Sequence, residues 1–259
     1  MSYTMQRLAK QTKLFGRYVM DGFAEASLAI IGCGRNGCSF ATLAAYSGFM
    51  DFVLVDPDVA EPRNVNATVP FFREDIGKPK VEVVKARMKA IDPSIQVETL
   101  QSRVQELEAE IILNSADVIV DATDSILAKK FLNESAAGNI RRGNSQKLVS
   151  LGSGIFVKNG RILQLGAQAT LFENGGACLM CGTLDPSDKV NLSRVSFVAV
   201  NLLASLLGLH LLVSALAGKD SGLERHDFVL YDILSQQVVA LNRAPHEGCE
   251  FCGKGVSSG

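Results

Sequence analysis

Short apolar runs alternate with helical patterns along the first part of the chain. The strand-like runs cover residues 28–31, 52–55, 95–100, 117–121 and 147–151. The helical patterns cover residues 6–22, 39–47, 81–91, 104–114 and 125–137. Because strands that alternate with helices build βαβ units, this pattern predicts an α/β fold with a mainly parallel sheet and helices on both faces.

The alternation ends in the second part of the chain. Residues 155–171 are rich in strand formers with no helical pattern between them, which predicts antiparallel strands at one edge of the sheet. Residues 195–218 contain no charged residue and are long enough to cross a membrane. Asn201, Ser205 and His210 interrupt this segment, and strand-like sequence follows it. We therefore expect a helix buried in the core or in a subunit interface, with a membrane span as the alternative.

A glycine-rich loop follows the first strand-like run. Gly32, Gly34 and Gly37 form the pattern G-x-G-x-x-G between this run and a helix. In such a loop the first glycine permits a tight turn, the second lets a phosphate approach the backbone, and the third lets the helix pack closely on the sheet. Asp56, at the end of the next run, can accept hydrogen bonds from ribose hydroxyls. The combination predicts a Rossmann-like, nucleotide-binding sheet, and a purely structural turn is the alternative.

The length, the net charge and the composition of the N-terminal residues limit the kinds of function that we expect. The 259 residues suffice for one large α/β domain or two small ones. A formal net charge of -1 with 20% charged residues gives no electrostatic reason to expect nucleic acid or an anionic membrane as a partner. Residues 1–15 lack the continuous apolar stretch of a secretory signal, so we expect a cytoplasmic protein.

Four of the six cysteines form two C-x-x-C pairs. The first pair is Cys178 and Cys181, the second is Cys249 and Cys252, and a glycine follows each pair. Four thiolates can close a tetrahedral Zn²⁺ site, whereas a reducing cytosol disfavours disulfides. We expect one structural zinc ion in a Cys₄ knuckle that ties the C-terminus back to Cys178. A redox pair or unliganded thiols are the alternatives.

The remaining cysteines and the histidines receive no chemical role. Cys33 and Cys38 flank the glycine loop, where we expect small buried side chains. His210, His226 and His246 have no spacing that indicates a joint site.

The order and spacing of these motifs resemble the ThiF/MoeB/HesA family, the bacterial relatives of ubiquitin-activating enzymes. The resemblance covers nearly the whole chain. The residues that carry it are the glycine loop, Asp56-x-Asp58, Asn64, Gly77-Lys78-Pro79-Lys80, Asp121-Ala122-Thr123-Asp124 and both cysteine pairs. It implies that ATP·Mg²⁺ adenylates the C-terminal carboxylate of a small ubiquitin-like or sulfur-carrier protein that ends in Gly-Gly, with release of pyrophosphate.

The resemblance also implies roles for single residues at the nucleotide. Gly32, Gly34 and Gly37 would line it, and Asp56 would hold the ribose. Asp58 and Asn64 would lie at the phosphates.

Two further residues would carry the chemistry. Lys80 would contact the α-phosphate, and Asp124 would position Mg²⁺. Attack of a carboxylate on the α-phosphorus brings two anions together, so cations and alignment matter more than acid–base chemistry. The alternatives are a solvated lysine at a helix start and an aspartate that caps the helix beginning at Ser125.

The chain departs from the family pattern at two positively charged positions. Where the family has an arginine after the loop asparagine, this chain has Ala67 followed by Thr68. We expect Arg63 or Arg73 to replace that charge in catalysis. Near the N-terminus, Lys10 takes the place of an arginine that reaches into the neighbouring subunit, with Arg7 nearby; a lysine lacks the bidentate fork of arginine.

A second departure concerns a cysteine that many family members carry downstream of the first C-x-x-C pair, where it is available for thioester or persulfide chemistry. Residues 182–248 contain no cysteine, and Ser193 lies near the matching position. We therefore expect the acyl-adenylate to react directly with an external acceptor, without a thioester, and an oxyester at Ser193 is the variant.

We therefore expect residues 1–259 to form a single ThiF-type adenylation domain that works as a homodimer through its apolar helix. Its parts are a helical arm (1–26), a nucleotide-binding core (27–150), a C-terminal region with strands, interface helix and zinc site (151–252), and a disordered tail (253–259). The first alternative is a non-catalytic or half-active subunit that binds a partner protein or a nucleotide. An NAD-dependent oxidoreductase is the second, although it leaves the cysteine pairs unexplained.

Overall fold

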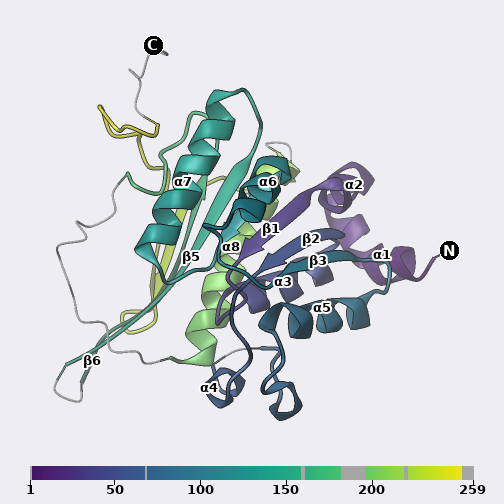
Figure 1. Cartoon of the computed structure of the whole chain (residues 1–259). Helices are drawn as coiled ribbons and strands as arrows, with labels where there is room; N and C mark the ends of the chain where they lie inside the picture. The colour runs from purple at the N-terminus through teal and green to yellow at the C-terminus, as the bar shows by residue number, and fades with distance from the viewer. Residues whose placement is uncertain (1, 68, 159–160, 182–195, 219–220, 253–259) are drawn as a thin grey trace.

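The strands of this protein form one mixed sheet. The computed structural model describes residues 2–67, 69–158, 161–181, 196–218 and 221–252. Within these residues, eight strands pair in the order β3-β2-β1-β4-β5-β6-β7-β8 (Figure 1). The parallel part comprises β1 (Ser27–Ile31), β2 (Asp51–Val55), β3 (Gln96–Leu100), β4 (Val118–Asp121) and the start of β5 (Lys147–Lys158).

The strand order changes direction between β1 and β4. β1 pairs with β2 on one side and with β4 on the other, so Ile31 lies beside both Val55 and Asp121. Open α/β sheets bind ligands at such a switch point, beyond the carboxyl ends of the strands. The fold therefore places the ends of β1, β2 and β4 at one potential ligand site.

The antiparallel part of the sheet contains the rest of β5, β6 (Arg161–Phe172), β7 (Phe228–Asp232) and β8 (Gln237–Leu241). β5 and β6 form a long antiparallel pair from Leu148 and Phe172 to Lys158 and Arg161. The predicted antiparallel edge is confirmed. The predicted strand at residues 147–151 was too short, because β6 continues to pair with β5 beyond residue 151.

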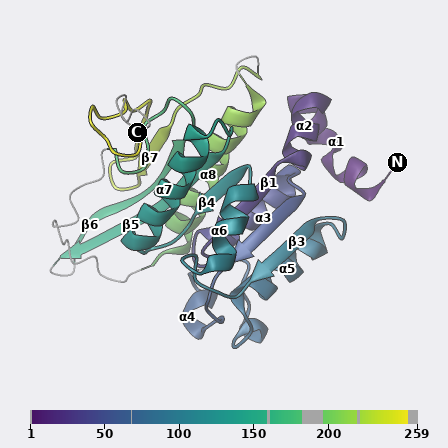
Figure 2. The ribbon, with the colours of Figure 1, turned by 45° about the horizontal axis from the view of Figure 1, so that its top comes forward.

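Helices cover both faces of the sheet, as predicted (Figure 2). One face packs against α1 (Tyr3–Phe15), α2 (Arg17–Glu25), α3 (Gly37–Ser47), α5 (Lys80–Ile91) and α8 (Val198–Ala217). The other packs against α6 (Leu107–Ser115) and α7 (Ile126–Arg141). In β1, Leu28 and Ile30 face the first layer, and Ala29 and Ile31 face the second. This alternation explains why β1 is apolar on both sides.

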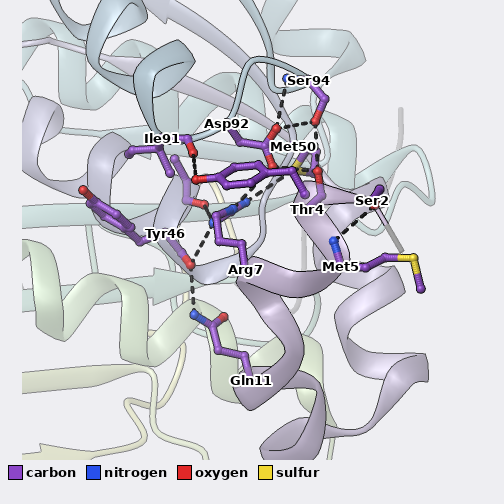
Figure 3. Close-up of polar contacts among 12 residues, drawn as sticks. Ser2, Thr4, Met5, Arg7, Gln11, Tyr46, Met50, Ile91, Asp92 and Ser94 are labelled. Atoms are coloured by element: carbon purple, nitrogen blue, oxygen red, sulfur yellow. Dashed lines mark hydrogen bonds and ion pairs between the residues drawn. The ribbon is translucent and has the colours of Figure 1, made fainter.

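The N-terminal segment forms two helices instead of the single one predicted at residues 6–22. Gly16 separates them with a φ of 79°, which a right-handed helix does not allow. Arg7 of α1 donates to the carbonyl of Ala45 at 3.0 Å and pairs with Asp92 at 3.3 Å (Figure 3). Thr4 also donates to Asp92, at 2.7 Å. These contacts fasten α1 to the ends of α3 and α5.

α8 is long and apolar enough to cross a membrane, but half of its most apolar stretch is buried within the protein. It packs against β5, β6 and α3. Gly208 lies against Leu151, where an added Cβ would approach the Leu151 side chain to 2.2 Å. This packing favours the predicted buried helix over a membrane span.

Candidate functional site

The glycine loop after β1 is tightly packed at its first and third glycines and open at its second. A Cβ at Gly32, whose φ is 93°, would lie 3.0 Å from the carbonyl oxygen of Ala122. A Cβ at Gly37 would lie 1.8 Å from the carbonyl oxygen of Gly32. A Cβ at Gly34 would meet no atom within 4 Å. The loop therefore has space at the position where a phosphate is expected to approach.

Asp56 connects this loop to the end of β2. Its side chain accepts hydrogen bonds from the backbone N–H groups of Cys33 at 2.7 Å and Asp58 at 2.8 Å. Burial raises the pKa of Asp56, although Lys80 and the two N–H donors act in the opposite direction. Each carboxylate oxygen has a second lone pair that could accept a ribose hydroxyl. The role of Asp56 in holding the loop was not predicted from the sequence.

Lys80 is a buried cation between two carboxylates. Its side chain is 9% exposed, and Nζ lies 2.7 Å from Asp58 Oδ2 and 3.9 Å from Asp56 Oδ1. The alternative of a solvated lysine at the start of α5 is therefore wrong. The Asp58 side chain is 62% exposed, which makes it the partner that an incoming anion can displace.

The turn after β4 carries two aspartates with opposite surroundings. Asp121 is fully buried, whereas Asp124 is exposed and forms no hydrogen bond or ion pair with any residue that the structure describes. Ser125 caps α7, because its hydroxyl accepts from the backbone N–H of Ala128 at 3.3 Å. The alternative of Asp124 as the helix cap is therefore wrong. Its carboxylate remains available to a ligand.

Sequence reasoning missed Lys129, which contacts Asp121. Lys129 Nζ lies 2.5 Å from Asp121 Oδ2 and 3.1 Å from the hydroxyl of Ser150. One signal could have indicated this pair. Lys129 is one turn after the Ser125 cap, and helical side chains point back toward the N-terminus, where Asp121 lies.

The loop after β2 contains α4 (Pro62–Val65) and the short 3₁₀ helix η1 (Arg73–Asp75). Asn64 Oδ1 accepts from the N–H of Glu61, the N-cap residue, at 2.7 Å, so the asparagine is part of a capping box at the start of α4. Arg63 is three-quarters exposed and pairs with the Glu61 side chain. Arg73 is exposed and has no ion-pair partner in the described part of the chain. Arg73 is therefore the freer of the two expected replacement charges.

The structure explains why no side chain from Ala67 can take part in binding. Ala67 is buried, and its carbonyl accepts a hydrogen bond from Asn201 of α8 at 2.8 Å. Thr68 lies outside the described residues, as does Ser193. In α1, the contacts of Arg7 with Asp92 occupy its guanidinium, which leaves exposed Lys10 as the candidate for reaching a neighbouring subunit.

The four predicted zinc ligands converge in a cluster. The Sγ of Cys178 lies 3.8 Å from that of Cys181 and 3.7 Å from that of Cys249, and the Cys181 and Cys252 sulfurs are 3.3 Å apart. All four sulfurs lie within 4.8 Å of one another. Tetrahedral zinc with Zn–S bonds of about 2.3 Å places sulfurs about 3.8 Å apart, so the cluster fits this metal.

The sulfur cluster is attached to the opposite end of the sheet from the glycine loop. It follows Phe172, which pairs with Leu148 near the amino end of β5. Arg243 holds the two cysteine segments together, because its guanidinium donates to the carbonyls of Cys178 and Cys181, each at 3.2 Å. A metal ion bound here would stabilise the fold and would take no part in chemistry at the glycine loop.

Cys33 and Cys38 are buried, as predicted. Burial raises the pKa of Cys33 well above its ordinary value, and it raises that of Cys38 to about 12. Both thiols are therefore protonated at neutral pH, and a protonated buried thiol is a poor nucleophile.

Known proteins resemble this chain over almost its full length. The model of the ThiF family matches residues 6–251. The sulfur carrier protein ThiS adenylyltransferase of Escherichia coli is 26% identical over 256 residues, which cover 98% of this chain and 95% of that protein. The SAMP-activating enzyme E1 of Haloferax volcanii is 24% identical over 239 residues, which cover 89% of this chain and 82% of that protein.

Solved structures share the fold. E. coli MccB with ATP superimposes with a TM-score of 0.75 at 21% identity, over 98% of this chain and 75% of that one. MccB with AMPCPP and MccA gives a TM-score of 0.76 at 20% identity, over 95% of this chain and 74% of that one.

Proposed function

Since the chain belongs to the ThiF family, we propose that it is an ATP-dependent adenylyltransferase that activates the C-terminal carboxylate of a small ubiquitin-like or sulfur-carrier protein. The single observation that carries this proposal is the free carboxylate of Asp124 beside an open glycine loop. The loop and the Asp124 turn are adjacent, because Gly32 packs against Ala122. Asp56 links the loop to buried Lys80, so these groups belong to one site.

The chemistry explains why such a site needs fixed cations. A carboxylate that attacks the α-phosphorus of ATP meets a strongly anionic target, and Mg²⁺ on the phosphates supplies part of the compensating charge. Asp124 would hold this ion. Lys80 is already buried in position, and it would transfer its hydrogen bond from Asp58 to the α-phosphate when the nucleotide binds.

Other residues would orient the nucleotide. Gly34 leaves space for phosphates at the N-terminus of α3, where the helix dipole favours anions. Asp56 would accept from the ribose. The Asn64 oxygen accepts from the N–H of Glu61, which leaves the amide nitrogen to donate to a phosphate. Arg73, with no ion-pair partner in the described chain, is the candidate for the additional charge.

The activated carboxyl group would pass directly to an external acceptor, which forms a bond to the acyl carbon as the acyl–phosphate bond breaks and AMP leaves. An acyl-adenylate is already reactive, so an internal thiol is not required. Cys33 and Cys38 are buried and protonated, and the other cysteines form the sulfur cluster. An oxyester at Ser193 remains the variant.

We also propose a cytoplasmic homodimer whose contact includes α8. α8 is strongly apolar, yet it leaves apolar side chains exposed. Leu206 in the helix is 48% exposed, and Phe197, just before the helix, is 50% exposed. Lys10 would then reach the nucleotide of the neighbouring subunit.

ATP–pyrophosphate exchange tests the activity. The purified chain is assayed with ATP·Mg²⁺ and a Gly-Gly-ending small protein encoded beside its gene. Exchange that depends on the small protein would support the proposal. Nucleotide binding without exchange would favour a half-active subunit. Binding of NAD in preference to ATP would overturn both interpretations.

A further inference from the structure

We infer that Lys129 is a positioning residue that holds buried Asp121 and thereby fixes the turn that carries Asp124. The inference rests on the proposed function, because it assigns Lys129 to the arrangement of the ion-binding carboxylate. The motifs of the sequence analysis do not include this lysine.

The Asp121 carboxylate is divided between two tasks. Asp121 is fully buried, and its Oδ2 contacts Lys129 Nζ at 2.5 Å and accepts from the Ser150 hydroxyl at 2.7 Å. Its Oδ1 accepts from the backbone N–H and the hydroxyl of Thr123, at 3.0 and 2.7 Å. One oxygen therefore faces the cation while the other shapes the turn.

The turn is also part of the wall of the glycine loop. The N–H of Ala122 donates to the carbonyl of Ile31 at 2.9 Å, and the Ala122 carbonyl lies where a Cβ of Gly32 would approach to 3.0 Å. A shift of Asp121 would therefore move the support of the loop together with Asp124. Lys129 acts on both through one carboxylate.

Lys129 is suited to this task and poorly suited to binding phosphate itself. Its ammonium group is already shared by Asp121 and Ser150, and its side chain is 28% exposed. Removing the cation would leave a buried carboxylate unpaired, which is unfavourable enough to make the side chain and its turn rearrange. Lys130 is the natural control, since it is next in the helix, is 53% exposed and pairs with Glu134 at 3.8 Å.

Hydrogen–deuterium exchange tests the inference without relying on activity. We compare wild type, Lys129→Met, Lys129→Arg and Lys130→Met as full-length chains. In Lys129→Met the peptides that cover residues 121–125 and 32–37 should exchange about tenfold faster, while peptides from β2 and β6 keep their protection. Lys129→Arg should stay close to wild type, and Lys130→Met should be unchanged.

A second measurement connects the turn to the ion. The Mg²⁺ concentration that gives half-maximal pyrophosphate exchange should rise about tenfold in Lys129→Met and return toward normal in Lys129→Arg. If Lys129→Met does not fold, Ser150→Ala replaces it, with a smaller change in the same direction expected.

Different results would contradict the adenylyltransferase activity and the positioning role of Lys129. Unchanged protection of residues 121–125 in a folded Lys129→Met or Ser150→Ala variant would overturn the role of Lys129, whatever the activity. Absence of pyrophosphate exchange in wild type with its partner would count against the adenylyltransferase, while the deuterium result would still decide whether Lys129 holds the turn.

Discussion

At the scale of single residues, Asp121 and Asp124 show how burial separates two carboxylates on one turn. Asp121 is fully buried and hydrogen-bonded on both oxygens, so it belongs to the framework. Asp124 is exposed and forms no hydrogen bond or ion pair with the residues that the structure describes. A variant at Asp124 can therefore test chemistry without testing stability.

We predict that Asp124→Asn lowers the rate of pyrophosphate exchange by at least about 100-fold, because an amide is a weak ligand for Mg²⁺. The melting temperature should remain within about 1 °C of wild type. The assay is exchange at saturating ATP, alongside thermal unfolding. Asp21→Asn, at an exposed aspartate of α2, serves as the control and should retain activity. Normal exchange in Asp124→Asn would show that this residue has another role.

We expect Lys80 to contribute both to nucleotide binding and to the stability of the fold. A Lys80 variant should therefore lose activity and stability together, whereas the Asp124 variant should lose activity alone. Lys80→Met should lower exchange by about 100-fold or more. It should also cost about 1 to 3 kcal/mol in the free energy of unfolding, because Asp56 loses a buried cationic neighbour. Exchange assays and urea unfolding measure the two effects. Lys78→Met is the matched control, since Lys78 is 56% exposed and pairs with Asp75; equal losses in both variants would contradict the assignment.

At the scale of elements, the sulfur cluster fastens the C-terminal segment to the loop after β6. The two C-x-x-C pairs are far apart in the chain, and Arg243, which precedes the second pair, donates hydrogen bonds to the carbonyls of Cys178 and Cys181 in the first. We predict one zinc ion per chain. Cys252→Ser should lose the metal, and its melting temperature should fall by about 10 °C.

Elemental analysis and thermal unfolding measure these two effects on protein purified under reducing conditions. Cys38→Ser is the matched control for metal content, because Cys38 is buried away from the cluster and should leave zinc bound. Absence of zinc from freshly purified wild type would refute the prediction.

The attachment of α1 depends on Asp92, and its contribution should vary with pH. Burial raises the pKa of Asp92, but hydrogen bonds from Ser94 and Thr4 and the charge of Arg7 outweigh burial and lower it overall. A lowered pKa in the folded state stabilises the protein above the unfolded value of about 3.9, and this stabilisation disappears as the pH falls through the folded value.

Asp92→Asn should therefore cost about 1 to 2 kcal/mol at pH 7, and the difference from wild type should shrink below about pH 4. Urea unfolding between pH 7 and pH 3 measures this dependence. Asp21→Asn again supplies the control, because Asp21 is largely exposed. A difference that is constant across this range would contradict the ionic role of Asp92.

At the scale of the whole molecule, the exposed side of α8 is the basis for the proposed dimer. We predict that Leu206→Asp weakens self-association, because it places a charge in the apolar contact. Analytical ultracentrifugation measures the assembly, and the matched substitution Leu234→Asp, at a similarly exposed leucine between β7 and β8, should leave it unchanged. A wild-type chain that remains monomeric at micromolar concentration would exclude this contact.

The sequence alone determined the alternating elements, the antiparallel edge, the glycine loop and the two cysteine pairs. These features depend on hydrophobic period and short spacings, which neighbouring residues encode locally. The family resemblance, which the match over residues 6–251 confirms, also rests on such local motifs. The assigned roles of Lys80 and Asp124 stay predictions.

Only the tertiary structure decided which charges are buried, paired or free. Lys80 meets Asp58 and Arg7 meets Asp92 across long stretches of chain, and the turn at Asp121 acquires Lys129 and Ser150 from two different elements. Local patterns cannot specify these contacts, because each depends on how separate helices and strands pack. Burial determines how strongly each charged side chain interacts with its neighbours. For this reason the buried aspartate, Asp121, holds the turn in place, whereas the exposed one, Asp124, is available to a ligand.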